Sequence, residues 1–430
     1  MTSDRRTLEI ESIAAGGDGV ARSDGLVVFV PRTARGERVV ARVTRKGRLA
    51  RGVVEVIERA ASERVPAECP HYERDGCGGC QLQHLSLAAQ REARRRIVAD
   101  AFRRIGRREV PLPELQSGER AWRYRRKLTL ALRRVPRDAM ARAAGGAARR
   151  GVPAWIAGLH AYDDPERVFA LDDCLITEER VVAAWREILA AGECLPRAPR
   201  LRGAVRLLGE RSARAAFVLE GARRWSAHGE FFARAPSLAA LWWVPDGGTR
   251  RLLHDRRETR GPGASFAQVN PEVAERLAAF VIAAAMAHTP ATVVDAYAGS
   301  GEVAAALAGR GVRVTAIELD PEASAWSATR LPAGSHTVRA RVEDALDGAL
   351  PADVVLLNPP RAGVDARVTA RLDAARDVRA IIYVSCDPAT LARDVARLPA
   401  WRIARLTAFD MFPQTAHVET VCEFVGASAP

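Results

Sequence analysis

The chain has 430 residues, of which 48% are hydrophobic and 27% charged, so it is long enough for two or three domains and too apolar for wholesale disorder. No apolar signal region opens it and no run is long enough to span a membrane, so we expect a cytoplasmic protein, a monomer, with no membrane partner. The formal net charge of +13 favours a polyanionic partner, of which nucleic acid is the natural candidate.

Short strands separated by glycine turns are predicted in residues 7–58, at 8–14, 19–21, 26–31, 38–45 and 52–57. Turn signals this regular predict a small β-barrel. The basic residues of its last hairpin could follow a phosphate backbone, although a solvated hairpin tip explains them nearly as well. They are Arg42, Arg45, Lys46, Arg48 and Arg51.

Cysteines gather directly after this region. Cys69, Cys77 and Cys80 lie within twelve residues, and the last two form a C-x-x-C motif whose glycines let backbone amides turn toward sulfur. In a reducing compartment such a group is typical of metal binding. A fourth ligand is needed; Cys174 is the first choice and Cys194 the alternative. The spacing does not separate a structural zinc site from an iron-sulfur cluster.

Basic residues continue into the middle of the chain. A helix predicted at residues 86–105 carries six arginines, a pattern most often found on a solvated face, but here it adjoins the cysteines. Trp122, Tyr124 and Lys127 then mix aromatic rings with cations ahead of an alternating strand, which favours a strand that contacts RNA. Residues 154–253 are expected to form a mainly antiparallel domain, after a loop at 137–151.

The last third predicts a doubly wound parallel sheet, because strands alternate with helices. A helix at 270–287 precedes strands at 293–296, 312–318, 336–340, 353–357 and 381–385. An antiparallel hairpin of residues 407–412 and 417–425 is expected to close the sheet at its edge.

A glycine turn after the first of these strands predicts a nucleotide-type cofactor site. Gly299 and Gly301 match the loose dinucleotide fingerprint, and Glu318 follows where an acid would hold ribose hydroxyls, a pattern that fits NAD equally well. Downstream, Asn358-Pro359-Pro360 ends the fourth strand, where methyltransferases bring base and S-adenosylmethionine together. Arg361 follows the prolines instead of an aromatic residue, which points away from methylation of an exocyclic amine.

Cys386 lies between a buried strand and a helix that Asp387 would cap and Pro388 would begin, where helix N-terminal amides would favour a thiolate. A buried structural cysteine is the alternative interpretation. Methylation of uracil at C5 needs such a thiolate, because addition to C6 makes C5 nucleophilic, and a base must then remove the C5 proton. Glu419 and His417 lie near a strand start at the same sheet edge. A shielded carboxylate there could have a raised pKa.

Several motifs together resemble the signature set of the RNA uracil-C5 methyltransferase family. The matching segments are Ser265-Phe266-x-Gln268-x-Asn270, the turn from Asp295 to Gly301, Asn358-Pro359-Pro360-Arg361, residues 385–394 and residues 410–419. The turn at residues 16–22, with residues 28–31 and 36–39, likewise resembles a TRAM domain, an OB-like RNA-binding barrel. Asn358 stands where many family members carry Asp, and the gap from Cys69 to Cys77 is longer than the family pattern.

The resemblance implies roles for individual residues. Cys386 would be the nucleophile and Glu419 the base, with Phe266 close to the target base. The cofactor S-adenosylmethionine would be bound by Gln268, Tyr297, Gly299, Glu318 and Asn358. A 4Fe-4S cluster, with zinc as the less favoured alternative, would be carried by Cys69, Cys77, Cys80 and Cys174, as in the branch of the family that acts on bacterial large-subunit ribosomal RNA.

The sequence therefore predicts three domains. Residues 1–60 form a TRAM-like OB-fold β-barrel, 61–262 a central α+β domain with the cysteine cluster, and 263–430 a Rossmann-like α/β methyltransferase domain. The predicted activity is S-adenosylmethionine-dependent formation of 5-methyluridine in structured RNA, with 23S ribosomal RNA favoured because barrel and cluster occur together. The alternatives are a transfer-RNA uridine-C5 methyltransferase and a catalytically silent RNA-binding or ribosome assembly factor.

Overall fold

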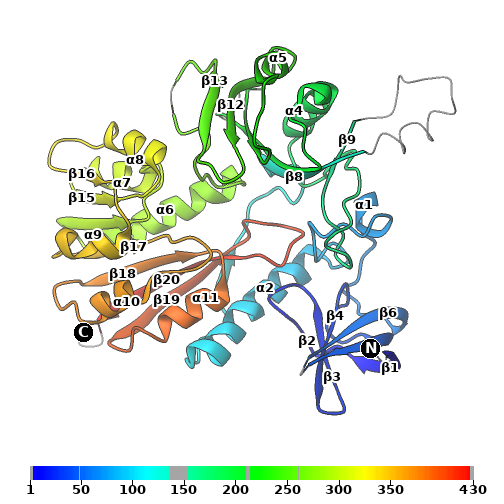
Figure 1. Cartoon of the computed structure of the whole chain (residues 1–430). Helices are drawn as coiled ribbons and strands as arrows, with labels where there is room; N and C mark the ends of the chain where they lie inside the picture. Colours follow the sequence, from blue (N-terminus) through cyan, green and yellow to red (C-terminus); the bar gives the residue numbers. More distant parts are fainter. Residues whose placement is uncertain (1–2, 48, 136–153, 210–213, 260, 427–430) are drawn as a thin grey trace. The chain divides into compact units, whose positions relative to one another are not determined.

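The computed structural model describes residues 3–47, 49–135, 154–209, 214–259 and 261–426 (Figure 1). They divide into two compact units. The first contains Met1–Pro66, Gln81–Glu119 and Ser265–Pro430, and the second contains Ala67–Cys80 and Arg120–Ala264. The three linear domains stay a prediction, since these units group residues by contact and not by order along the chain.

A six-stranded sheet begins the first unit, with strand order β1-β5-β6-β4-β3-β2. Alternate residues such as Val28 and Val30 point inward and are fully buried, so the sheet has a core of its own. Arg48, predicted to follow a phosphate backbone, lies outside the described residues. The strands are β1 (Ser3–Glu9), β2 (Ser12–Ile13), β3 (Gly19–Ser23), β4 (Leu26–Val30), β5 (Arg38–Lys46) and β6 (Leu49–Arg59).

The larger sheet of this unit has eight strands in the order β16-β15-β14-β17-β18-β20-β19-β7. The first five run parallel, as the alternation of strands and helices predicted. Their bounds are β14 (Thr292–Ala296), β15 (Arg313–Ile317), β16 (His336–Val338), β17 (Val354–Leu357) and β18 (Ala380–Ser385). The remaining strands are β7 (Glu114–Gln116), β19 (Trp401–Phe409) and β20 (Glu419–Gly426).

Helices cover both faces of this sheet, so its central strands are apolar throughout. Along β17, Val354 and Leu356 pack with α6 and α7, whereas Val355 and Leu357 face the core shared with α9, α10 and α11. The helices are α2 (Leu87–Ala101), extended by a π-helical turn at Phe102–Gly106, then α6 (Pro271–Ala287), α7 (Glu302–Ala308), α8 (Pro321–Ala328), α9 (Val342–Ala349), α10 (Ala366–Asp373) and α11 (Pro388–Val395).

The predicted C-terminal hairpin is present, but its place at the sheet edge was wrong. β20 pairs antiparallel with both β18 and β19, and the short strand β7 then pairs parallel with β19 and forms the edge. Three residues that follow Pro111 and Pro113 carry no alternation to predict a strand. β7 is therefore created by docking onto β19 and not by its own sequence.

The second unit contains a six-stranded sheet with order β13-β12-β11-β10-β8-β9. All neighbouring pairs are antiparallel except β11 and β12, which confirms a mainly antiparallel sheet. The loop predicted at 137–151 lies outside the described residues. The elements are α1 (Pro70–Glu73), β8 (Lys127–Arg134), β9 (Trp155–Gly158), α4 (Glu179–Ala190), a 3-10 turn (Gly192–Cys194), β10 (Arg200–Leu207), β11 (Ala215–Glu220), α5 (His228–Ala233), β12 (Leu238–Val244) and β13 (Arg251–Asp255).

Helices α4 and α5 pack on one face of this sheet, where Leu128, Leu130 and Leu132 of β8 join the core. Within the described ranges of the chain, no helix is long and apolar enough to cross a membrane.

Candidate active site

Cys386 and Glu419 meet because of the register between β18 and β20. The last residue pair of this antiparallel ladder is Ser385 with Thr420, so the next step along both strands brings Cys386 opposite Glu419. Cys386 is half-buried and Glu419 is 3% exposed. The thiol and the carboxyl group are close enough for the charge of Glu419 to act on Cys386. The predicted nucleophile and the predicted base are thus held at the ends of adjacent strands of one sheet.

The helix after Cys386 begins as its sequence predicts. Asp387 caps α11 by accepting a hydrogen bond from the Thr390 amide at 2.9 Å, and Pro388 occupies the first turn. The expected preference for a thiolate was wrong, however. Burial raises the pKa of the Cys386 thiol, and the neighbouring Glu419 raises it further. Both effects favour the thiol as the resting group.

Arg361 acts against both effects. It hydrogen-bonds the Cys386 thiol and lowers its pKa, and it also opposes the increase at Glu419. Burial nevertheless raises the pKa of Glu419 to about 8. The Thr390 hydroxyl donates to the Arg361 carbonyl at 3.1 Å, which ties this arginine to α11. The predicted increase in the pKa of Glu419 is therefore found. From the sequence, Arg361 counted as evidence against amine methylation and as part of a motif, but its contact with Cys386 was not predicted.

The loop before Glu419 is held by α2. Gln90 makes two hydrogen bonds of 2.9 Å to Gln414, one to its side chain and one from its backbone amide. Arg94, fully buried, contacts the Asp410 carboxylate at 2.9 Å and donates to the Thr415 carbonyl at 2.7 Å. Arg94 therefore does not lie on a solvated face, where such a run of arginines is most often found. The buried carboxylate of Asp410 gives Arg94 a reason to be inside.

A cradle for a nucleotide-type cofactor lies at the carboxyl ends of β14 and β15. Gly301 has φ +72°, and a Cβ there would lie 2.3 Å from the Ser327 hydroxyl, so only glycine fits. A Cβ on Gly299 would meet nothing within 4 Å, so this turn is open for a ligand. The Gly299 amide donates to Glu318 at 2.8 Å, which places that carboxylate at the turn. These features fit an adenosyl cofactor bound at a sheet switch point.

Other predicted cofactor residues border this edge of the sheet. Tyr297 follows β14 with φ +63°, a strained conformation that concentrates at functional sites. Asn358 follows β17, where its amide donates to the Ala296 carbonyl at 3.3 Å and the residue is exposed. Gln268 is half-buried in the segment before α6. Asp295, not singled out as a ligand, is buried with its pKa raised to about 7, and it accepts a hydrogen bond from the Ala304 amide.

Comparison with known proteins decides the family. Residues 334–424 match the model of the tRNA (Uracil-5-)-methyltransferase family. The 23S rRNA (uracil(1939)-C(5))-methyltransferase RlmD of Chromohalobacter salexigens is 35% identical, over 96% of this chain and 88% of its own length. The RlmD protein of Halomonas elongata is 32% identical, over 97% and 89%. The chain belongs to the RNA uracil-C5 methyltransferase family.

A solved structure agrees in fold with this RNA uracil-C5 methyltransferase. The Pyrococcus abyssi tRNA (uracil-54, C5)-methyltransferase, crystallised with S-adenosyl-L-homocysteine, superposes with a TM-score of 0.66 over 98% of this chain and all of that one, at 21% identity. The predicted family, the methyltransferase-like fold and the dependence on S-adenosylmethionine are therefore confirmed.

The predicted RNA-contacting residues of the methyltransferase differ in exposure. Phe266 is 71% exposed, as expected for a ring that meets a base. Trp122 is half-buried and its indole N–H donates to Glu68 at 3.2 Å, whereas Lys127 lies half-buried at the start of β8. Tyr124 is 2% exposed and packs in the core of its unit, which corrects the expectation of an exposed stacking platform at this residue. Its aromatic ring packs in the hydrophobic core beside the sheet.

The four predicted metal ligands all belong to the second unit, and all are buried. Cys69, Cys80 and Cys174 belong to one core cluster. Burial raises the pKa of the Cys174 thiol, and the charge of nearby Cys69 raises it further. The Gly79 amide donates to the sulfur of Cys77 at 3.4 Å, as the glycines of the motif predicted. Burial raises the pKa of the alternative ligand Cys194, and the charged groups that act on it are those of Glu230, Arg234 and Glu193, not the other cysteines.

Across the part of the chain that the structure describes, no three His, Cys, Asp or Glu side chains form a group ready to hold a metal ion. A tetrahedral zinc site brings its ligands to about 2.3 Å from one ion, so its sulfurs must touch. In an iron-sulfur cluster each cysteine binds a different iron, which leaves the thiolates farther apart. Buried thiols with an amide donor are compatible with either group.

Proposed function

We propose that this enzyme forms 5-methyluridine in structured RNA, with 23S ribosomal RNA as the favoured substrate. The observation that carries the proposal is the pairing of the Cys386 thiol with a buried, proton-holding Glu419 on neighbouring strands. Carbon methylation of uracil needs this pair, whereas methylation of an amine or hydroxyl does not. The full-length similarity to proteins named 23S rRNA methyltransferases supports the substrate.

The chain's own groups perform the covalent steps. Cys386 loses its proton to water, aided by the Arg361 guanidinium, and its sulfur adds to C6 of uracil. S-adenosylmethionine supplies the methyl group that C5 then receives. Glu419 first gives its resting proton to solvent, then takes the C5 proton as a carboxylate, and the electron pair of the C5–H bond expels the sulfur from C6.

Binding roles follow from the positions of the predicted residues. The cofactor is held by Gln268, Tyr297, Gly299, Glu318 and Asn358, with Glu318 turning from the Gly299 amide toward ribose hydroxyls. Because Asn358 is neutral, it acts as a hydrogen-bonding group and not as an anion. The target uridine leaves its stack to reach Cys386, with Phe266 beside it. Trp122 and Lys127 contact the RNA elsewhere.

The linear division supports the same function. We assign residues 1–60 to a TRAM-like RNA-binding barrel, 61–262 to a central iron-sulfur and RNA-binding domain, and 263–430 to the methyltransferase domain. The six-stranded N-terminal sheet with its separate core supports the first assignment. The protein acts as a cytoplasmic monomer.

Mapping of 5-methyluridine by mass spectrometry tests the function. In cells without the gene, we expect one 5-methyluridine to disappear from 23S ribosomal RNA, while transfer RNA keeps all of its own. Loss from transfer RNA instead would establish the second candidate, which the family description and the archaeal structure favour. Unchanged modification of both RNAs would leave a catalytically silent RNA-binding or assembly factor.

A second prediction concerns the cysteines. Cys69, Cys77, Cys80 and Cys174 carry a 4Fe-4S cluster that supports the central domain. Protein purified without oxygen should contain about four irons and four sulfides per chain. Cys174→Ala should lose this iron, whereas Cys194→Ala, an equally buried thiol of the same core, should keep it. Zinc without sulfide would disprove the cluster.

A further inference from the structure

The face of the second unit's sheet opposite α4 and α5 is partly exposed along β8 and β10. On β11 it is open only around Glu220, because Ala216 is buried there with Trp242. The ladder places Lys127 opposite Arg206 and Arg133 opposite Arg200, with Arg202 between them beside Ala131. Like charges directly across a ladder destabilise a sheet. Two such pairs on one face therefore destabilise the fold, which suggests that these cations serve in binding.

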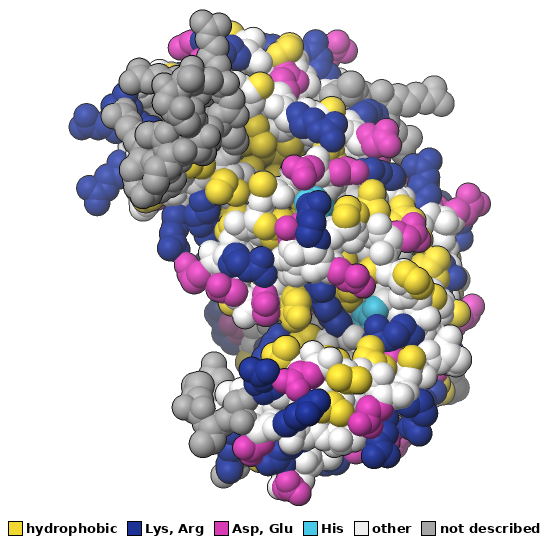
Figure 2. Space-filling view, turned by 90° about the vertical axis from the view of Figure 1, so that its right-hand side faces the viewer, with side chains coloured by type: hydrophobic (Ala, Val, Ile, Leu, Met, Phe, Trp, Pro, Cys, Tyr) yellow, Lys and Arg dark blue, Asp and Glu magenta, His cyan; other side chains and the backbone are white. Residues whose placement is uncertain are grey.

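Few acids balance these cations. Arg202 makes a bidentate ion pair with Glu220 of β11, at 2.7 and 2.8 Å, and Arg200 contacts Glu166 at 3.1 Å. All these pairing groups are at least 40% exposed, so solvent screens both ion pairs. Figure 2 shows acidic and basic side chains interspersed over the surface that it draws. On β8, β10 and β11, the sheet face opposite the helices instead carries five cations and one carboxylate.

The pKa of Lys127 is lowered, in part by the excess of positive charge on this face. Burial lowers it first, and repulsion by Arg206, Arg202 and Arg125 lowers it further, against a smaller opposite effect of Glu220. An anion placed over these strands would relieve the repulsion.

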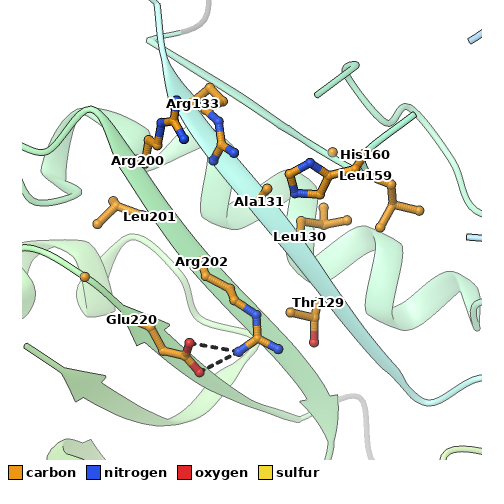
Figure 3. A pocket seen from close by; sticks show the side chains of 12 residues that line it. Thr129, Leu130, Ala131, Arg133, Leu159, His160, Arg200, Leu201, Arg202 and Glu220 are labelled. Carbon is orange, nitrogen blue, oxygen red and sulfur yellow. Dashed lines mark hydrogen bonds and ion pairs between the residues drawn. The ribbon is translucent and has the colours of Figure 1, made fainter. Parts of the chain in front are cut away.

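A hollow lies among these cations (Figure 3). It measures about 460 Å³ and is bordered by Arg133, Arg200, Arg202 and His160. Small residues make the space, since Thr129 and Ala131 face it from β8 and Gly158 from β9. This volume falls within the range of small-ligand sites. Leu130, Leu159 and Leu201 also border it. The arginines around the hollow suit the phosphate of a sugar-phosphate unit.

We propose that this face of the β8–β10–β11 sheet is a second RNA-binding surface, which grips the phosphate backbone of the substrate away from the reacting uridine. The inference rests on the proposed function and extends it. Glu220 holds Arg202 in place without RNA and gives it up to a phosphate when RNA binds. Contacts of this kind add affinity and fix the position of the RNA without reading its sequence.

The test measures binding of a fluorescein-labelled oligouridylate by anisotropy as salt rises from about 50 to 200 mM. The open-face variant Arg133→Gln/Arg202→Gln loses two phosphate contacts, so its slope of log affinity against log salt should fall by about 1.4. The control Arg186→Gln/Arg234→Gln removes the same charge from the helix-covered side, including an arginine that is also ion-paired to a glutamate. Its slope should equal that of the wild type.

Two further variants guard against a folding artefact. Arg133→Lys/Arg202→Lys keeps the charges and should keep the slope. Glu220→Gln removes the competing carboxylate and should bind the oligouridylate several-fold more tightly, a result that misfolding does not produce. Equal slopes for the open-face and control variants, or weaker binding by Glu220→Gln, would overturn the inference. Binding is measured without methyl transfer, so an inactive wild type would refute the proposed function alone.

Discussion

Cys386→Ala should reduce methyl transfer by a factor on the order of 10⁴ or more while RNA binding stays nearly intact. Without the sulfur, C5 of uracil remains too weak a nucleophile to attack the methyl group, and no other group beside the site replaces that step. The measurement is transfer of a labelled methyl group from S-adenosylmethionine to RNA, with binding followed separately.

A matched control is available on the partner strand. Cys422 of β20 is fully buried in the same sheet, and burial raises the pKa of its thiol. Cys422→Ala should lose some stability through a small cavity and keep its chemistry. Undiminished turnover by Cys386→Ala would rule out the thiolate mechanism.

Glu419→Gln should trap the enzyme on its RNA. The sulfur can still add to C6 and the methyl group can still be transferred, but no base removes the C5 proton, so the adduct accumulates. It should appear as a methylated RNA–protein species that survives denaturation, whereas the wild type releases its product. Normal turnover without an adduct would make His417, which is exposed two residues earlier, or water the base.

The pH dependence gives this prediction a second measurement. Glu419 removes a proton only when ionised, so kcat/KM, which reports the ionisation of the free enzyme, should increase as pH rises toward about 8. Glu423→Gln is the control, because this buried carboxylate of β20 is paired with Arg405 and His288, away from Cys386. It should retain turnover and the same profile.

The melting temperature of Glu419→Gln shows whether this variant loses its chemistry or its fold. The pKa of Glu419 rises from its ordinary 4.5 to about 8 on folding. A group whose pKa is raised in the folded state stabilises the fold below its unfolded pKa, and that contribution is lost as pH rises through the folded value. Glu419→Gln carries no such group, so its melting temperature relative to the wild type should increase between about pH 4.5 and 8.

Local signals accounted for the predictable part of this structure. Asp387 with Pro388 and Asn270 with Pro271 mark helix starts by capping chemistry that acts within a few residues, and both caps form. The glycine turn and Glu419 were likewise found from neighbours in sequence. The resemblance to a known family then gave the chemistry that these positions serve.

The rest depended on contacts between distant segments. Arg94 and Tyr124 look like surface residues in a basic stretch, and only Asp410 and the core of the second unit give reasons to bury them. The thiol pKa of Cys386 required knowledge of its burial and of Glu419 across the ladder. β7 exists because β19 offers it an edge.

The contact between α2 and the loop before β20 orders events during synthesis. Gln90 and Gln414 are 324 residues apart in sequence, yet they bind each other directly. The ribosome makes the N-terminal part first, so α2 must wait for nearly the whole chain before Gln414 and Asp410 arrive. Contacts of such long sequence separation form late. The proposed catalytic base, Glu419, is therefore among the last groups to be placed.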